Sequence, residues 1–318
     1  MSCVSYCVFR IGQEISPTYA LRNTAAAEAH PVIVAPFLSY PVLAEILVQK
    51  RFPMSSLVQT TTDGPVHTIR LNRPDKRNAL NADLVTALKS ALDEAEDAED
   101  LRVVVLTGAG SAFSAGADLS SLRAMRDAGP MENQRDSRHL AELFRQIYQH
   151  PMPVIAKANG HAIGGGCGLA AVCDFAYAAE GAKLGFTEVR IGFVPAIVMV
   201  FLRRKVGEAR ARDLLLRGRL VDATTAADLG LVTRAVPEGA LDEAVEDLAR
   251  ELARDTSGSA VALTKQMLAQ VPGMGLDEAL DYAVQMNAFA RGTDDCQAGI
   301  DAFLNDQDPP WKQAASEA

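Results

Sequence analysis

The sequence predicts an α/β protein whose last third is helical. Short apolar runs of strand length alternate with helical patterns between residues 57 and 185. Two of these runs end at glycine-rich loops, and after Gly185 the strands give way to a series of helices. This order of elements favours an α/β part followed by a helical part. A chain of 318 residues is long enough for one large domain or two modest ones.

The first strands follow a segment of different character. Residues 1–53 show no sustained period and end in proline, whereas "LVQTTTDGPVHTIRLN" predicts two short strands around a turn at Asp63-Gly64. We therefore expect residues 1–53 to be an N-terminal extension that is disordered or not native, with Met54 as the natural start. Residues 54–250 are expected to form the core, and residues 251–318 a helical C-terminal region.

The following segments alternate between helix and strand. "NADLVTALKSALDEAEDAED" predicts a helix because leucines at 84, 88 and 92 recur every four residues. "LRVVVLTGAG" reads as a buried strand, "SAFSAGADLSSL" as a loop entering a helix, and "PMPVIAKANGHAIGGG" as a strand entering a turn. "CGLAAVCDFAYAAE" begins as a helix and continues as a strand. Further helices are expected at 137–149, 206–217, 223–229, 240–254, 258–270, 275–290 and 293–304.

Composition narrows the class of protein. The chain is 48% hydrophobic and 22% charged, which is typical of a globular protein with a buried core. A net charge of -9 argues against nucleic acid as the main partner. The five cysteines lack metal-ligand spacing, which indicates reduced thiols. No apolar run has transmembrane length and no convincing signal peptide is present, so we expect a cytoplasmic protein without membrane contact.

Two glycine loops carry the strongest functional signal. "NGHAIGGGCGLA" opens a helix, where unpaired N–H groups can bind an anion or a developing oxyanion. A tight turn packed against a neighbour explains the same glycines equally well. A dinucleotide loop is disfavoured because the third glycine of that motif is missing. "SAFSAGADLSSL" also exposes N–H groups after a strand, so the two loops together can place two donors on one carbonyl oxygen.

These motifs resemble the crotonase superfamily, also called the enoyl-CoA hydratase/isomerase family. The resemblance covers the chain from about Leu57 to its end, and it lies in "LNRPDKRNALN", "VVVLTGAGSAFSAGADL", "PVIAKANGHAIGGGCGLAAVCDFAYAAEGAKLGFTEVRIGFVP" and "RLVDATTAADLGLVTRAV". It implies a crotonase fold, which is a spiral of β-β-α units with a helical C-terminal trimerisation region. It also implies an acyl-CoA substrate, a homotrimer or dimer of trimers, no metal, and no cofactor beyond the CoA of the substrate.

The resemblance also assigns roles to individual residues. Ala117 and Gly165 would supply the two oxyanion N–H groups, and Glu188 would be the catalytic carboxylate; a surface acid paired with Arg190 is the alternative for Glu188. Lys76 and Arg77 would contact the CoA phosphates, unless they form a solvated charged turn. The other positions implied at the substrate are Ala79, Ala115, Gly116, Asp118, Leu119, Gly164 and Gly168. Asp118 is interpreted as a loop cap rather than a catalyst.

One expected acid is missing. Two-glutamate hydratases of the family carry their first glutamate where this chain has Gly168, while Glu188 matches the second. A single carboxylate beside the apolar "IGFVPAIV" should have a raised pKa, and it can move a proton between carbons or activate a water.

Three functions therefore remain open. They are an enoyl-CoA hydratase acting on a branched or carboxylated chain, an enoyl-CoA isomerase, and a non-catalytic acyl-CoA-binding homologue. "GGGCGL" with "FTEVRIGFVPAIV" is similar to bacterial methylglutaconyl-CoA hydratase-like members. This similarity favours the hydratase, with a place in fatty acid metabolism or branched-chain amino acid degradation.

Overall fold

The computed structural model describes residues 57–314, so the expected extension 1–53 and the start at Met54 lie outside the described part. Its strands are β1 Val58–Asp63, β2 Val66–Leu71, β3 Val103–Gly108, β4 Ala112–Ser114, β5 Val154–Ala158, β6 His161–Ile163, β7 Phe175–Ala179, β8 Lys183–Gly185, β9 Leu220–Asp222 and β10 Arg234–Val236. Its helices are α2 Ala82–Glu96, α3 Leu119–Ala124, α4 Pro130–Gln149, α5 Gly165–Val172, α6 Ala196–Val206, α7 Glu208–Arg217, α8 Ala223–Asp228, α9 Leu241–Asp255, α10 Gly258–Gln270, α11 Leu276–Ala290, α12 Asp294–Leu304 and α13 Pro310–Ala314. Short 3-10 turns include η1 Pro74–Lys76 and η3 Glu188–Ile191.

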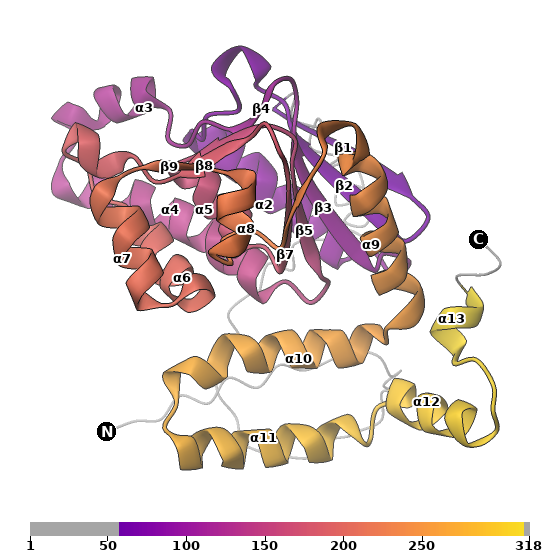
Figure 1. Ribbon diagram of the computed structural model, residues 1–318. Coiled ribbons are helices and arrows are strands. Elements are labelled where there is room, and N and C mark those ends of the chain that lie inside the picture. Colours follow the sequence, from indigo (N-terminus) through magenta and orange to yellow (C-terminus); the bar gives the residue numbers. More distant parts are fainter. Residues whose placement is uncertain (1–56, 315–318) are drawn as a thin grey trace, which may run out of the picture. The chain divides into compact units, whose positions relative to one another are not determined.

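Two sheets organise the first two thirds of this part (Figure 1). The larger sheet has the order β1-β2-β3-β5-β7-β10, and the smaller has the order β4-β6-β8-β9. Only the outer pairs β1-β2 and β8-β9 are antiparallel. In the larger sheet, one continuous register joins Ile69, Leu106, Ala156 and Ala176 across β2, β3, β5 and β7.

Each turn of the chain adds one strand to each sheet and then a helix. β3 and β4 lead to α3, β5 and β6 lead to α5, and β7 and β8 lead to η3 and α6. The expected spiral of β-β-α units is therefore confirmed. Because the strands within each sheet are parallel neighbours, the loops that follow β4, β6 and β8 gather at one edge of the smaller sheet.

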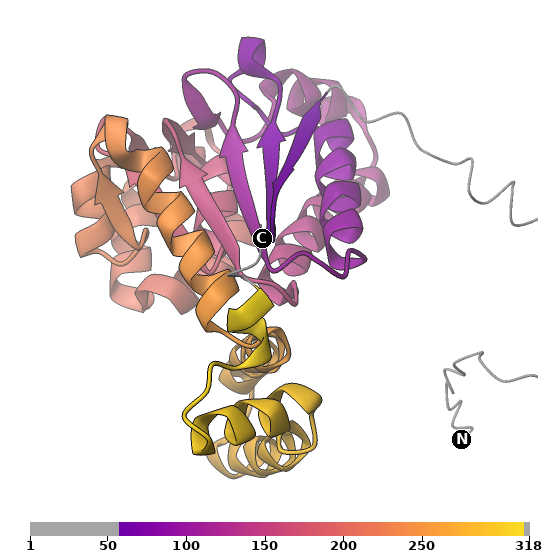
Figure 2. The same ribbon diagram turned by 90° about the vertical axis from the view of Figure 1, so that its right-hand side faces the viewer.

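The four residues of the run "VVVL" are all apolar, so both faces of their strand must be buried against other elements. Val104 and Leu106 join the main core, which also contains the leucines of α2. Val103 and Val105 point the other way and pack with Val245 in a second cluster, where α9 supplies the cover. In Figure 2 the strands of the larger sheet (indigo to pink) lie side by side, with α9 (orange) at one side of them and the purple α2 at the other.

The helical predictions hold with several differences. α4 begins at Pro130 rather than at 137, and the expected helix 206–217 is α7, which begins after Gly207. The preceding helix α6, Ala196–Val206, was not assigned in the sequence pattern because its apolar residues show no clear face. Gly207 has a positive φ of 77°, so it separates α6 from α7 at a sharp bend.

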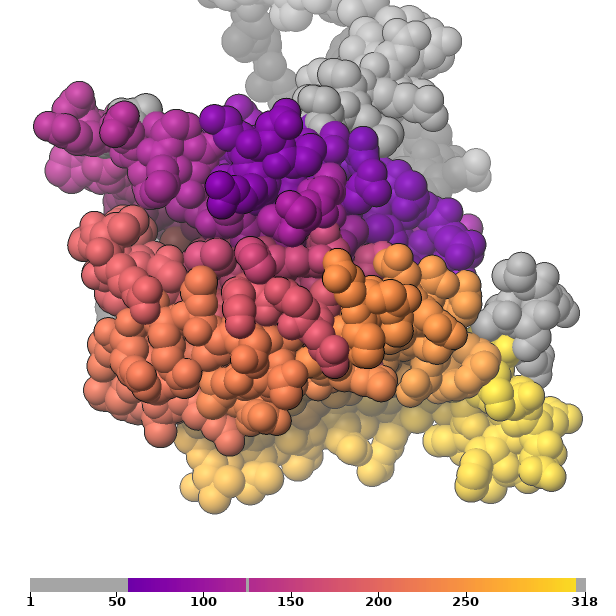
Figure 3. Space-filling view, turned by 45° about the horizontal axis from the view of Figure 1, so that its top comes forward, coloured from indigo at the N-terminus to yellow at the C-terminus, as the bar shows by residue number. Residues whose placement is uncertain are grey.

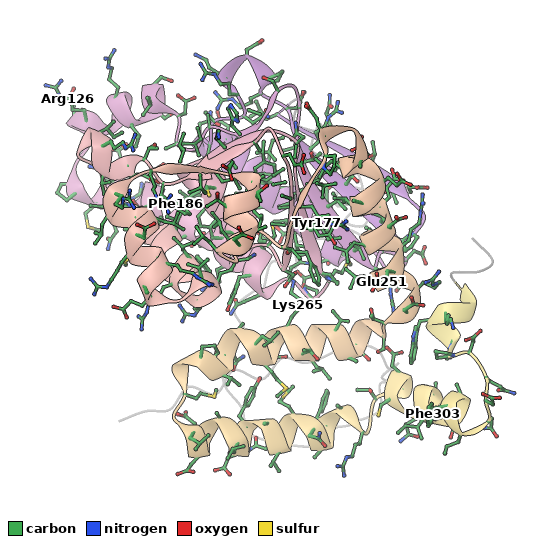
Figure 4. All side chains as sticks on the ribbon, in the orientation of Figure 1. Arg126, Tyr177, Phe186, Glu251, Lys265 and Phe303 are labelled. Carbon is green, nitrogen blue, oxygen red and sulfur yellow. The ribbon has the colours of Figure 1, made fainter. Side chains whose placement is uncertain are left out.

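The C-terminal helices begin beyond the predicted boundary. Residue 250 falls within α9, which packs on the larger sheet, and α10 starts only after the cap residue Ser257. α10 contacts the rest of the molecule through Lys265, whose Nζ lies 2.6 Å from Asp174 Oδ2 and donates to the Met152 carbonyl (Figure 4). No helix in the described range 57–314 is long and apolar enough to cross a membrane.

Candidate active site

A cavity of about 490 Å³ lies at the edge of the smaller sheet where the loops after β4, β6 and β8 meet. Its walls come from α2, α3, α4, η3 and the start of α6 as well as from these loops. In Figure 3 the two parts of the chain that line it, near residues 115–140 (magenta) and 187–198 (salmon), lie next to each other at the surface.

Two backbone amides meet at this edge. The amides of Ala117 and Gly165 belong to the loops after β4 and β6, and neither donates to another group of the described chain. The loops touch closely, since a Cβ atom at Gly165 would lie 3.9 Å from the Ala117 nitrogen. Gly165 is the first residue of α5, so its N–H is one of the unpaired donors at a helix start. The pair is therefore suited to hold one negatively charged oxygen.

Glycine is required where these loops cross. Gly116 has φ of 85°, and a Cβ atom there would lie 2.5 Å from the Ile163 carbonyl oxygen. A Cβ atom at Gly166 would lie 2.3 Å from the Ser114 carbonyl oxygen. Any side chain at either position would push the loops apart and separate the two amides.

A buried asparagine fixes the first loop, the one after β4, by hydrogen bonds. Asn78 is fully buried with φ of 55°, and its side-chain amide donates to the carbonyls of Ala109 and Ala112 at 2.9 and 2.8 Å. Its own carbonyl accepts a bond from the Ser114 hydroxyl at 2.8 Å. Sequence reasoning missed this role, although an asparagine in a turn motif is the residue type that accepts positive φ most readily.

Glu188 faces the cavity from the first residue of η3. Its carboxylate lies beside Gly164, where a Cβ atom would come within 3.1 Å of Glu188 Oε1. Its Oε2 atom is buried and has no hydrogen-bond partner among the described residues. Within residues 57–314, Glu188 forms no salt bridge with Arg190, which was the alternative role for this acid. Burial raises the pKa of this carboxyl, as expected.

Gly168 does not line the cavity. It lies inside α5, and a Cβ atom there would be 2.3 Å from Val198 Cγ1 and 3.3 Å from Phe144 Cε2. The first turn of α6 thus fills the space into which a side chain at position 168 would extend. The packing around position 168 therefore leaves no room for a glutamate side chain.

Asp118 acts as the expected loop cap. Its Oδ1 atom accepts from the Ser120 N–H at 2.9 Å, and its Oδ2 atom pairs with the Arg73 guanidinium at 2.9 Å. Hydrogen bonds from Ser120 and Arg73 lower the pKa of Asp118 to about 2. A carboxylate held in this way is a poor proton carrier near neutral pH. The sequence did not indicate Arg73, which lies 45 residues away along the chain.

The remaining predicted positions divide into two groups. Ala115, Leu119 and Gly164 line the cavity together with Ala117, Asp118, Gly165 and Glu188. Ala79 and Gly116 lie behind the wall, where the Gly116 carbonyl accepts from the Leu80 N–H at 2.7 Å. Lys76 and Arg77 are exposed at the end of η1, and neither forms an ion pair with a described residue.

The cavity also contains residues that the motifs did not indicate. They come from α2, α3, α4 and the start of α6, and they include Val85, Leu122, Asp136, His139, Leu140, Ile197 and Val198. Only the fold brings these helices to the glycine loops. Their apolar periodicity in the sequence is that of ordinary core-facing helices, so no local signal distinguishes them.

The two loops, the facing carboxylate and the β-β-α spiral define an oxyanion site on a crotonase fold. Comparison with known proteins agrees, since the sequence model described as Enoyl-CoA hydratase/isomerase matches residues 61–314. The chain belongs to this family of enzymes.

Several relatives are similar over nearly their whole length. A putative enoyl-CoA hydratase of Thermus thermophilus is 46% identical over 246 residues, which cover 77% of this chain and 97% of that protein. The 2,3-dehydroadipyl-CoA hydratase of Escherichia coli is 34% identical over 245 residues, covering 77% and 94%. A solved structure of a putative enoyl-CoA hydratase/isomerase (crotonase) from Legionella pneumophila is 36% identical, with a TM-score of 0.73, and covers 80% of this chain and 98% of that one.

Proposed function

We propose that this protein is an enoyl-CoA hydratase that adds water across the double bond of a 2-enoyl-CoA. The observation that carries the proposal is that a carboxylate with an unpartnered buried oxygen faces the same cavity as two unpartnered backbone amides. The names of the Thermus thermophilus and Escherichia coli relatives support the same reaction.

In the proposed mechanism, the amides of Ala117 and Gly165 donate to the thioester carbonyl oxygen. Charge moves onto this oxygen when hydroxide adds to C3, and two fixed dipoles stabilise the resulting enolate. Glu188 takes one proton from the attacking water. The protonated carboxyl then returns that proton to C2, so one carboxylate serves as base and acid in turn.

The geometry around Glu188 suits both halves of this cycle. Its pKa is raised by burial, which brings its proton affinity closer to that required near neutral pH. Gly164 leaves the carboxylate room on one side because it has no side chain. Lys76 and Arg77, exposed on η1 just before the cavity-lining Leu80, are proposed to contact the CoA phosphates.

The test of this function is turnover of a 2-enoyl-CoA with the product identified by mass. The wild-type protein should give a product heavier by one water. Glu188→Gln keeps the shape of the side chain but removes the base, so kcat should fall by about 10²–10⁴. Its affinity for a non-reactive acyl-CoA should stay close to that of the wild type because both amides remain.

The pH profile provides a second reading of the same residue. A general base must be deprotonated, so kcat/KM should fall as the pH drops through the pKa of Glu188, which burial raises from its ordinary value. A folded Glu188→Gln protein with nearly full activity would show that the proton carrier lies elsewhere.

The filled space at Gly168 favours a second candidate, enoyl-CoA isomerisation. With Val198 packed where a second carboxylate would stand, one carboxylate can take a proton from C4 and return it to C2. An unchanged product mass with a moved double bond would indicate this reaction. Tight acyl-CoA binding without turnover would indicate the non-catalytic homologue. Trimeric assembly and a cytoplasmic location stay predictions.

A further inference from the structure

The cavity wall that extends away from Glu188 is built from aliphatic side chains. They come from four different helices and are Val85 on α2, Leu122 on α3, Leu140 on α4, and Ile197 and Val198 on α6. Val85 and Val198 are almost fully buried, and Leu140 and Ile197 pack against the main core. An acyl chain whose carbonyl lies at the amides of the glycine loops would continue along this wall.

The acids of this cavity have no lysine or arginine beside them in its wall. Among the described lining residues the acids are Asp118, Asp136 and Glu188, and the one histidine, His139, has its Nε2 atom 3.0 Å from Thr86 Oγ1. Asp118 is neutralised by its pair with Arg73, whereas Asp136 is exposed on α4 and has no ion-pair partner among the described residues. Glu188 is likewise unpaired. Asp136 therefore presents a negative charge to a bound acyl chain, and an ionised Glu188 adds a second one.

These two observations affect acyl chains differently. An uncharged aliphatic chain gains by moving from water to an apolar wall. A chain that ends in a carboxylate loses the hydration of its charge there, and it also meets acids of the same sign. The cost is greatest when the chain is short enough for its terminus to stay inside the cavity.

We propose that the substrate class of this enzyme is the uncharged aliphatic 2-enoyl-CoA, and that the cavity excludes chains with a terminal carboxylate. The inference rests on the proposed function, because it concerns which enoyl-CoA is used. It separates this chain from the Escherichia coli relative, whose name specifies the carboxylated 2,3-dehydroadipyl-CoA. Of the chains considered from the sequence, it retains unbranched and branched ones and rejects carboxylated ones.

The test compares two substrates of equal chain length. trans-2-Hexenoyl-CoA and 2,3-dehydroadipyl-CoA both have six carbons and differ only in the terminal group. We expect kcat/KM to be at least about 100-fold higher for hexenoyl-CoA, because the carboxylate loses its hydration against the aliphatic wall and meets acids of the same sign. Product mass is measured for both, so that hydration is distinguished from isomerisation.

A charge change on the wall tests the cause. Asp136 is exposed, so Asp136→Lys should fold, and Asp136→Asn is the matched control that removes the acid without adding a cation. The preference for hexenoyl-CoA should narrow by about tenfold in Asp136→Lys relative to Asp136→Asn, through faster use of dehydroadipyl-CoA. The gain should shrink at high salt because the group is near solvent.

Each outcome has a distinct meaning. Equal kcat/KM for the two substrates in the wild type would overturn the inference, and would point to the unpaired first-turn amides of α6 as the group that receives the carboxylate. If Asp136→Lys and Asp136→Asn prefer hexenoyl-CoA over dehydroadipyl-CoA to the same extent, the negative charge of the wall is not what excludes the carboxylate. No turnover of either substrate would instead count against the proposed function.

Discussion

The contact between Gly168 and Val198 can be tested with a single methyl group. Alanine in place of glycine inside a helix normally stabilises it by about 1 kcal/mol. In α5 the added Cβ atom would lie 2.3 Å from Val198 Cγ1, well inside contact distance. Overpacking of this kind costs about 1–3 kcal/mol, so we expect Gly168→Ala to lower the free energy of unfolding by up to about 2 kcal/mol.

Val198→Ala removes the clashing atom. Alone, it should cost about 1–3 kcal/mol, because two methyl groups leave a buried site that is only 5% exposed. In the double variant the new methyl at position 168 occupies part of the space that Val198 vacated. Gly168→Ala should then be neutral in the Val198→Ala background, which gives a favourable coupling energy equal to its cost alone, up to about 2 kcal/mol.

The assay is urea unfolding at one protein concentration, since assembly would make stability depend on concentration. Gly181→Ala is the matched control, because a Cβ atom there meets nothing within 4 Å and the expected change is within about 0.5 kcal/mol. Additive effects of the two substitutions, within about 0.5 kcal/mol, would refute the packing argument. The same reasoning predicts that Gly168→Glu destabilises the protein without improving hydration.

Three further predictions concern the loop, the CoA site and the assembly. Because the pKa of Asp118 is lowered to about 2, its contribution is present above the ordinary carboxyl pKa and is lost on acidification. The stability of the wild type should therefore fall more steeply than that of Asp118→Asn between about pH 4 and pH 2, as measured by urea unfolding. Changing Lys76 and Arg77 to Ala should weaken CoA binding measured by calorimetry, and more so at low salt, whereas unchanged affinity would return both to a solvated turn. Leu280 and Val284 are exposed on α11, and aspartate at both should reduce a trimer to monomers in light scattering if this face forms the subunit contact.

Much of the fold follows from local patterns. The run "VVVL" is a strand with two buried faces, and the leucines of α2 define one apolar face, because periodicity depends only on neighbours in the chain. The side chains of the caps Asn81, Ser257 and Thr293 fix three helix starts by accepting from the amide three residues ahead. The missed helix α6 lacks such a cap and begins after Pro195.

Some residues of the candidate site could be named from the sequence, and others only from the tertiary structure. The glycine loops and Glu188 stand in recognisable motifs, so their residues could be named from the sequence by resemblance. The tertiary structure decided the rest: the pair Arg73–Asp118, the support by Asn78, the contact of Val198 with Gly168, and the acidic, aliphatic wall from α2, α3, α4 and α6. Each of these joins segments far apart in the chain, and their side chains meet only because parallel β-β-α turns bring successive loops to one edge of a sheet. Local propensity contains no information about such distances, whereas packing determines them.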